Sequence, residues 1–496
     1  MMLIRGAYVF DGTGRPPKKA DVLIHGSKIA AVGSFPKKKA GDVIDGTGMR
    51  LMPGFVDVNT ASDHYLTLMS DPGQEDFLRQ GVTTTIGGNC GVSLAPFLYG
   101  GLESVRMWCD PSGVNVDWHT VREFFGTFRA LRLGVNFGTL VGHTTVRHAL
   151  VGDESRDLTV RELAMLRRIV EEALEDGALG LSTGFGYVHA QGIPMAELEK
   201  LLPIVAASGG IYATHLRDER EGLIPSVKEV LRLAGRIRVP IEISHLRPFI
   251  GFEKRFDAAV SALDAENADV TFDLYPFDTS IIPIYTLLPR WAQSGIEEMR
   301  RNLATAHFRE RVIDELRSFS GDDCRVIAAP HADYLVGKTV AMFAAGRGLR
   351  DAAGLLELMR VTHLRATVLM RDVNVDWAVT TLAHHPKAFV ASHAPSFGER
   401  SAVLRHERLE RTFPHFLRTV TEARLLTPEA AIAKMTSLAA RRFGLARRGE
   451  IKEGFFADLV LMKEGVIRDV FVNGAHAVRE GVPTGMRAGA VLARRI

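Results

Sequence analysis

Three residues of the kinds that bind transition metals each stand at the end of a separate strand-like run of this chain. Cys90 lies in the glycine-framed stretch Ile-Gly-Gly-Asn-Cys-Gly at 86–91, while His215 and His245 close the apolar runs at 211–214 and 241–244. Thiolate and imidazole are the ligands that zinc prefers, and three protein ligands leave a fourth position open for water. A single buried cysteine is more often a packing residue, so it is the joint occurrence at three strand ends that predicts one catalytic-type metal ion.

The elements that must position these residues are read from apolar runs that alternate with helix-length amphipathic stretches, a pattern typical of βα units. Eight candidate strands lie at 54–58, 82–86, 136–141, 179–182, 211–214, 241–244, 270–274 and 389–392. They fit an α/β fold built on a TIM-type (β/α)8 barrel, whose active site gathers at the C-terminal ends of the strands. Each candidate ligand follows such an end, so we expect the three side chains to meet at the barrel mouth.

The two ends of the chain share a different texture. Short strands broken by Asp-Gly and Gly-Ser turns fill residues 1–53, and the same style returns over 441–496. Because segments near the two termini often pair in compact folds, we expect them to form one small β-sandwich domain beside a barrel of residues 54–440. The stretch at about 281–349 has helical patterns of its own and no barrel strand, so it is expected to be an insertion that covers the barrel mouth.

Composition limits the function classes. The 496 residues are 46% hydrophobic, and 61 basic and 58 acidic residues are spread along the whole length, with a net charge of +3. This balance gives no reason to expect nucleic acid as a partner. No apolar run approaches the ~18 residues of a membrane span. Three widely spaced cysteines without a CxxC pair, together with an N-terminus that lacks a signal-peptide core, predict a cytoplasmic protein.

Several sequence blocks identify a family that this chain resembles. The blocks lie, in order, at 53–57, 89–91, 177–184, 213–219, 243–245, 434–438 and 449–460. Together they resemble the N-acyl-D-amino-acid deacylase family of the amidohydrolase superfamily over nearly the whole chain. Asn-Cys-Gly, Thr-His-Leu-Arg-Asp-Glu and Ile-Ser-His are specific in combination, whereas Ala-Asp-Leu-Val at 457–460 indicates only the superfamily.

The resemblance implies both a metal and a reaction. Cys90, His215 and His245 would hold one tightly bound zinc ion, which would activate a water molecule. The substrate would be a small-molecule amide, such as an N-acyl-D-amino acid, and the enzyme would hydrolyse its C–N bond. The sequence does not set the acyl group, the stereochemistry or the oligomeric state.

Two positions depart from the family pattern. The first strand of a superfamily member normally ends in His-x-His, but Asn59 and Ala61 stand there, so a second tightly held metal is not expected. The eighth strand normally ends with an aspartate that serves as general base, and this chain has His393 instead. His393 could take the water proton, since its ordinary pKa near ~6.5 suits that task. It could also bind the metal or fill space.

Further residues are candidates for supporting roles. Asp63 and His64 offer a carboxylate and an imidazole that could act as compensating ligands after strand one, or could lie in a solvated loop. Tyr187, Arg247 and His143 are candidates for lining the substrate pocket, with Arg247 suited to a substrate carboxylate.

Two rival functions remain open at this point. The altered strand ends would also fit a catalytically silent homologue that acts as a binding or assembly protein. The same metal chemistry would also hydrolyse a cyclic amide or a lactone.

Overall fold

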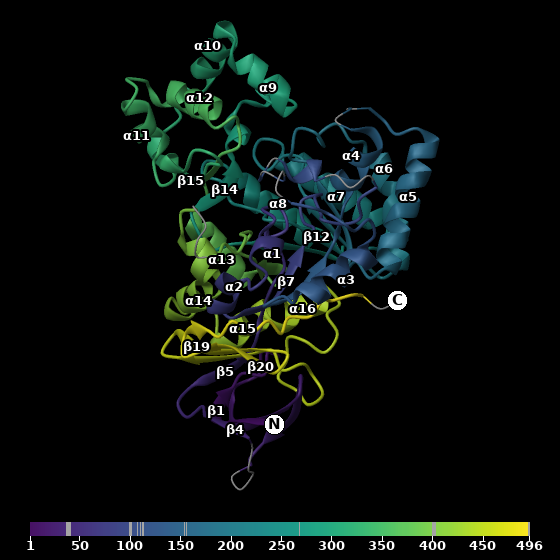
Figure 1. The fold of residues 1–496 in the computed structure, drawn as a ribbon, viewed down its shortest axis with the longest axis vertical. Helices are drawn as coiled ribbons and strands as arrows, with labels where there is room; N and C mark the ends of the chain where they lie inside the picture. Colours follow the sequence, from purple (N-terminus) through teal and green to yellow (C-terminus); the bar gives the residue numbers. More distant parts are fainter. Residues whose placement is uncertain are drawn as a thin grey trace.

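The computed structural model describes residues 1–35, 41–98, 102–106, 108–109, 111, 114–152, 154, 156–266, 268–398 and 403–494. The molecule is elongated, with a β-sheet domain at one end, the barrel in the middle and a mostly helical insertion at the other end (Figure 1). Among the described residues, no helix combines the length and the apolar character that crossing a bilayer requires.

A ring of parallel strands forms the centre of the described chain. The six-stranded part runs in the order β17-β13-β12-β11-β10-β9, and the three-stranded part in the order β6-β7-β8. Leu140 separates β8 from β9, so these two segments act as one barrel strand. The barrel strands are β6 (Phe55–Asp57), β7 (Val82–Gly87), β8 (Asn136–Thr139), β9 (Val141–Gly142), β10 (Gly180–Gly184), β11 (Ile211–His215), β12 (Ile241–Ile243), β13 (Val270–Leu274) and β17 (Ala388–Val390). The predicted (β/α)8 barrel is confirmed, and each predicted strand has its counterpart within a few residues.

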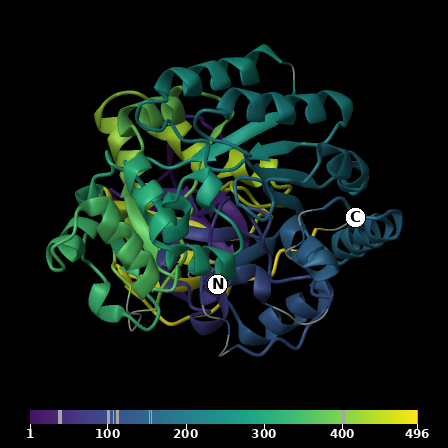
Figure 2. The same ribbon diagram turned by 90° about the horizontal axis from the view of Figure 1, so that it is seen from above.

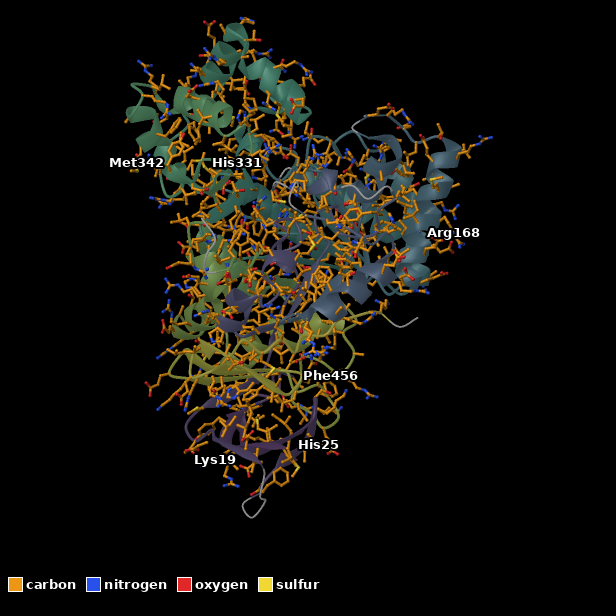
Figure 3. The ribbon with its side chains drawn as sticks, in the orientation of Figure 1. Lys19, His25, Arg168, His331, Met342 and Phe456 are labelled. Carbon is orange, nitrogen blue, oxygen red and sulfur yellow. The ribbon has the colours of Figure 1, made fainter. Side chains whose placement is uncertain are left out.

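Amphipathic helices pack around this ring. In α5 (Val160–Glu175) the apolar side chains at 166, 169, 170, 173 and 174 recur at helical spacing and face the barrel, while Arg168 points outward (Figure 3). The Thr159 side chain caps the first turn in a box with Glu162, which fixes where the helix begins. The other barrel-side helices are α1 (Thr67–Ser70), α2 (Glu75–Arg79), α3 (Val121–Leu131), α4 (His143–Val151), α6 (Met195–Ala207), α7 (Leu223–Arg236), α8 (Glu253–Ala265), α13 (Val375–His384), α14 (Glu407–Glu422), α15 (Pro428–Met435) and α16 (Ser437–Arg442).

Strands from both ends of the chain share one sheet. The two halves join where β5 (Arg50–Pro53) pairs antiparallel with β18 (Leu459–Lys463). The remaining strands are β1 (Met2–Val9), β2 (Lys18–His25), β3 (Lys28–Gly33), β4 (Asp42–Asp45), β19 (Val466–Val472), β20 (Ala475–Arg479) and β21 (Val482–Pro483). Leu51, Leu459 and Phe471 belong to one buried cluster, so both chain ends contribute to the same core.

The insertion has a sheet and a core of its own. Its strands β14 (Thr279–Pro283), β16 (Thr367–Arg371) and β15 (Cys324–Ala328) are antiparallel. The insertion therefore extends to β16, beyond the predicted limit near residue 349, because the returning strand pairs with the outgoing one. Its longer helices are α9 (Ile296–Leu303), α10 (Ala306–Glu315), α11 (Val340–Ala345) and α12 (Asp351–Val361). Seen from above, the insertion (green) lies over one side of the molecule, opposite α5 (Figure 2).

Candidate active site

Three residues beyond barrel strand ends share an unusual backbone conformation. Cys90 follows β7, His245 follows β12 and His393 follows β17, with φ values of +53°, +38° and +45°. Residues other than glycine rarely adopt this left-handed region, and such strain concentrates at functional sites. The loop around Cys90 also needs a glycine at 91, because a Cβ there would lie 2.7 Å from the backbone nitrogen of Gly184. The loops thus hold their side chains in set positions at the barrel mouth.

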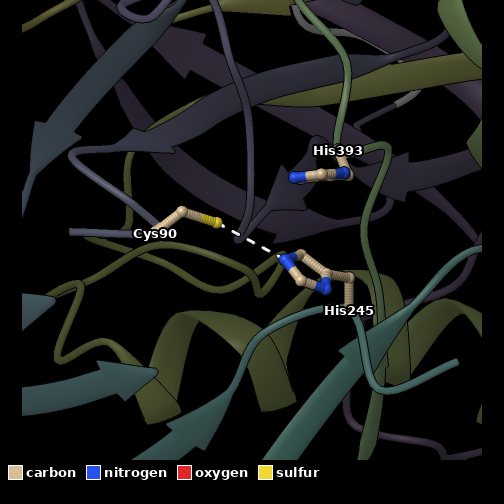
Figure 4. Close-up of side chains that lie close together, drawn as sticks. All are labelled: Cys90, His245 and His393. Carbon is tan, nitrogen blue, oxygen red and sulfur yellow. Dashed lines mark hydrogen bonds between the residues drawn. The ribbon is translucent and has the colours of Figure 1, made fainter. Parts of the chain in front are cut away.

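Cys90 and His245 face each other across the barrel mouth. The Cys90 Sγ lies 3.4 Å from His245 Nε2 (Figure 4). On the other side of the ring, His245 Nδ1 lies 3.0 Å from Glu219 Oε1. The Glu219 carboxylate holds its charge and accepts hydrogen bonds, so the ring proton of His245 is on Nδ1. The lone pair of Nε2 is therefore directed toward the cysteine sulfur.

The same carboxylate contacts the other type of ring nitrogen, Nε2, in the second histidine. Glu219 Oε2 lies 3.4 Å from His215 Nε2. His215 Nδ1 is buried and has no hydrogen-bond partner among the described residues. The two imidazoles stand edge to face, with ring centroids 4.4 Å apart. Glu219 thus accepts a hydrogen bond from one nitrogen of each ring. The second nitrogen of each ring carries a lone pair that can bind a metal.

Burial sets the electrostatics of this group. It disfavours ionisation of Glu219, but Arg247, His245 and His215 outweigh that effect and hold the pKa of Glu219 well below its usual range. Burial lowers the pKa of His245 to about 4, so the ring is neutral and able to coordinate. Burial, reinforced by Asp273 and Glu219, raises the pKa of the Cys90 thiol. The thiolate therefore needs a cation beside it.

These features fit a metal site better than a nucleophilic cysteine. Cys90 is 1% exposed, and among the described residues it is not part of the cavity wall, so a substrate could not reach its sulfur. A soft sulfur with neutral imidazole nitrogens is a zinc-type donor set. An orphaned buried nitrogen such as His215 Nδ1 is what a bound ion would satisfy.

The candidate ligands form two groups, and one of them contains His393, for which the sequence left a ligand role open. Ligand atoms of Cys90, His245 and His393 lie within 4.8 Å of one another, and so do those of His215, Glu219 and His245. His245 belongs to both groups. Cys90 and His215, which were expected in one trio, do not share such a group among the described residues, and His245 lies between them.

His393 faces the same centre from the last barrel strand. Its ring centroid lies 4.5 Å from that of His245, and it lines the cavity. Behind it, Nη2 of Arg408 lies 3.4 Å from Nδ1. Burial, together with His245 and Arg408, holds the pKa of His393 well below its usual range. This environment opposes the role of proton acceptor that the sequence suggested for His393.

The end of the first barrel strand contains no metal-binding pair. Asn59 donates from Nδ2 to Asp273 at 3.2 Å, and Ala61 has no donor atom. Asp63 accepts the backbone N–H groups of Gly88 and His64, so it supports the Cys90 loop. His64 lines the cavity and donates from Nε2 to the carbonyl of Asn89 at 3.2 Å. Neither Asp63 nor His64 joins a group that could hold a metal among the described residues.

A cavity of about 720 Å3 opens over this centre. Tyr187 and Arg247, both predicted to line the pocket, are part of its wall. The guanidinium of Arg247 pairs with Glu219 and donates to Ser280 Oγ at 3.1 Å, so its charge already has a partner. The insertion supplies an apolar wall that includes Ile281, Leu287, Leu288, Leu316, Phe319 and Met370.

His143 lies elsewhere. Its side chain is fully buried and its Nε2 lies 2.6 Å from Glu197 Oε1. It is not among the described residues that line the cavity, so the structure gives no support to its predicted contact with substrate. A polar residue after a strand looks alike in sequence whether it faces the cavity or a buried partner.

Two residues near the centre were not found from the sequence. Asp273, at the end of β13, accepts the backbone N–H of His245 at 3.0 Å, and burial raises its pKa to about 7. Its position at a strand end was a usable signal. Arg408 lies in α14, where nothing in the sequence distinguishes it from the other arginines of that helix.

Comparison with known proteins was made for sequence and for structure. No protein-family model matches the chain. It is 31% identical to D-aminoacylase of Alcaligenes xylosoxydans xylosoxydans over 99% of this chain and 97% of that protein. The N-acyl-D-aspartate deacylase and N-acyl-D-glutamate deacylase of the same organism are 30% and 31% identical, over 94% and 96% of their lengths.

Solved structures agree. A D-aminoacylase crystal structure superposes with a TM-score of 0.80 at 28% identity, covering 99% of each chain. N-acyl-D-glutamate deacylase from Bordetella bronchiseptica, in complex with zinc and a phosphonate inhibitor, gives 0.81 at 27%, again over 99% of each chain. A D-hydantoinase from Thermus sp. shares the fold, with a TM-score of 0.56 at 17% identity.

The barrel, the β domain built from both chain ends and the cysteine–histidine centre together define an amidohydrolase, a metal-dependent hydrolase of C–N bonds other than peptide bonds. Within that class the chain belongs to the D-aminoacylase family of N-acyl-D-amino-acid deacylases. This membership favours the enzymatic interpretation over that of a catalytically silent homologue.

Proposed function

We propose that this protein hydrolyses the amide bond of an N-acyl-D-amino acid with one zinc ion held by Cys90, His215 and His245. The observation that carries the proposal is the position of Glu219, which contacts His245 Nδ1 at 3.0 Å and His215 Nε2 at 3.4 Å. Carboxylates behind metal-bound histidines fix the tautomer and strengthen the ligand. Here a single carboxylate does this for two rings.

A zinc ion at this position would lower the pKa of bound water to roughly 7 and polarise the substrate carbonyl. We infer a single ion because Asn59 and Ala61 offer no imidazole at the end of β6. One solved structure of D-aminoacylase has a binuclear metal centre, in which one metal activates and the second metal attenuates. Support for one active metal in this chain comes from its own altered residues.

The remaining roles follow from the cavity. His393 lines it beside the candidate ligands, so His393 would meet the reacting amide. Tyr187 and Arg247 would contact the amino-acid part of the substrate, and the apolar wall of the insertion would exclude water. The substrate would be a small molecule, with neither nucleic acid nor a membrane as a partner. The three free cysteines suit a reducing cytoplasm.

The metal site can be tested by comparing two cysteines. Cys90→Ala should abolish zinc binding and amide hydrolysis, because it removes the sulfur ligand. Cys324→Ala is the matched control, since Cys324 is also fully buried but lies in β15 of the insertion. Zinc content is measured on both purified variants, together with amine release from N-acyl-D-amino acids. A Cys90→Ala protein with the zinc content and activity of the control would contradict the proposal.

A further inference from the structure

The unusual residue of this site, His393, has an equally unusual neighbour. Arg408 is an arginine with only 1% of its surface exposed, and its guanidinium lies 3.7 Å from the ring centre of Tyr275. It donates to the main-chain carbonyls of Thr279 and His393 at 2.9 Å and of Ser392 at 3.0 Å. These bonds tie Arg408 to the end of the last barrel strand and to the start of the insertion, so its position is fixed.

The position of Arg408 decides which nitrogen of His393 carries a proton. Its Nη2 lies 3.4 Å from His393 Nδ1. The two hydrogens of Nη2 go to the carbonyls of Ser392 and His393, but a hydrogen on Nδ1 would point at this cation, so it is the lone pair of Nδ1 that faces the guanidinium. A neutral imidazole has one N–H, which is therefore on Nε2. One ring nitrogen of His393 points to the side on which Cys90 and His245 lie, and the other is next to its own main chain (Figure 4).

The neighbouring histidine is arranged in the opposite way. His245 Nδ1 faces the Glu219 carboxylate, which places the proton on Nδ1 and leaves Nε2 as a lone pair. The carboxylate beside Nδ1 of His245 leaves Nε2 of that ring able to bind a metal. The guanidinium beside Nδ1 of His393 instead leaves Nε2 of that ring able to donate a hydrogen bond. The two rings lie 4.5 Å apart at one centre and have different chemistry.

We propose that Arg408 holds His393 in the Nε2–H tautomer, so that His393 donates a hydrogen bond to the substrate's amide carbonyl oxygen. This inference rests on the proposed function, because it assigns a role in the same reaction. It makes His393 neither a base nor a metal ligand: both roles need a lone pair on Nε2, which would move the proton to Nδ1, against the guanidinium. Arg408 is a positioning residue that acts through His393.

The donor role suits the chemistry of the cavity. Negative charge develops on the carbonyl oxygen as water adds to an amide, and a fixed donor aimed at that oxygen lowers the barrier. His393 lines the cavity, and a ligand-type atom of its ring lies within 4.8 Å of those of Cys90 and His245. A substrate carbonyl beside the metal centre would therefore lie within reach of this N–H.

The tautomer can be measured without any substrate. Full-length protein labelled with 15N at histidine is studied by NMR, and His393→Gln identifies the His393 signals. We expect a protonated Nε2 and an unprotonated Nδ1 at neutral pH, both before and after one equivalent of zinc is added. A proton on Nδ1, or loss of the Nε2 proton when zinc binds, would overturn the proposal. Because the proposed function could fail while this result holds, the two failures are distinguishable.

Two substitutions at each position separate the possible roles. Arg408→Lys keeps a cationic donor and should keep the Nε2–H signal, whereas Arg408→Met should lose the single tautomer. If the methionine variant does not fold, the wild-type spectrum still decides.

In kinetics, His393→Gln keeps an N–H donor and should retain activity to within about tenfold, whereas His393→Asp should lose about 10²–10³-fold in kcat. A more active Asp variant than Gln variant would identify position 393 as a base and contradict the donor role.

Discussion

At the scale of single residues, the site depends on how Glu219 and Arg408 distribute protons between three imidazoles. Glu219 contacts a nitrogen of His245 and of His215, and Arg408 contacts one of His393. Residue type alone therefore predicted the metal-binding side chains but not their tautomers. Cysteine and histidine after strands are visible in a sequence, whereas the arginine behind His393 comes from a helix after the last strand. The misplaced expectation for His143 has the same origin.

Removing the charge of Glu219 tests this arrangement. We expect Glu219→Gln to weaken zinc binding by about 10–100-fold, because the amide no longer fixes both histidines in their ligand tautomers. Affinity is measured by competition with a chromophoric chelator. Glu229→Gln is the control, since Glu229 also pairs with an arginine, Arg217 at 3.2 Å, but contacts neither histidine. Equal affinities in the two variants would contradict the role given to Glu219.

At the scale of elements, the barrel strands were predictable and their closure was not. Short runs of apolar and β-branched residues marked the barrel strands, including Val270–Leu274 with the bounds that the structure has. What closes the ring between the first and last strands is polar. Asp57, at the end of β6, accepts the backbone N–H of Ser392 at 3.1 Å and of Asn59 at 3.3 Å. In the sequence Asp57 is a single aspartate in an apolar run, which does not indicate that it joins the first strand to the last.

Asp57 makes stability depend on pH. Burial raises its pKa to about 7, above the ~3.9 of an unfolded chain. The folded state therefore binds the proton more tightly, so the free energy of unfolding falls as pH rises from about 4 to about 7, by at most about 1.4 kcal/mol per pH unit. Asp57→Asn should lose less stability than the wild type between pH 5 and pH 8 in urea unfolding. Equal losses in both proteins would show that Asp57 does not titrate in this way.

At the scale of the whole molecule, the insertion has a hydrophobic core of its own, separate from that of the barrel. Leu355, Leu358 and Val368 are fully buried in a cluster that is distinct from the barrel core. The sequence indicated an insertion because barrel strands were missing there. Its length was underestimated because β16 looks like any short strand until its partner is known.

A substitution in that core should loosen the insertion alone. We expect Leu355→Ala to destabilise it by about 2–5 kcal/mol, because the side chain is fully buried and leaves a cavity. Hydrogen exchange should accelerate over residues 284–368 and stay unchanged in the barrel strands. Equal acceleration in the barrel would mean that insertion and barrel unfold as one unit.

The central claim is that one zinc ion at Cys90, His215 and His245 makes this chain a deacylase of N-acyl-D-amino acids. Titration of metal-free protein with zinc, while D-amino acid release is followed, tests it most directly. Activity should rise from zero to a plateau at about one equivalent, and further zinc should not change it, because Asn59 and Ala61 provide no second site. Zinc bound at one equivalent without cleavage of any N-acyl-D-amino acid, or activity that needs a second equivalent, would contradict the account.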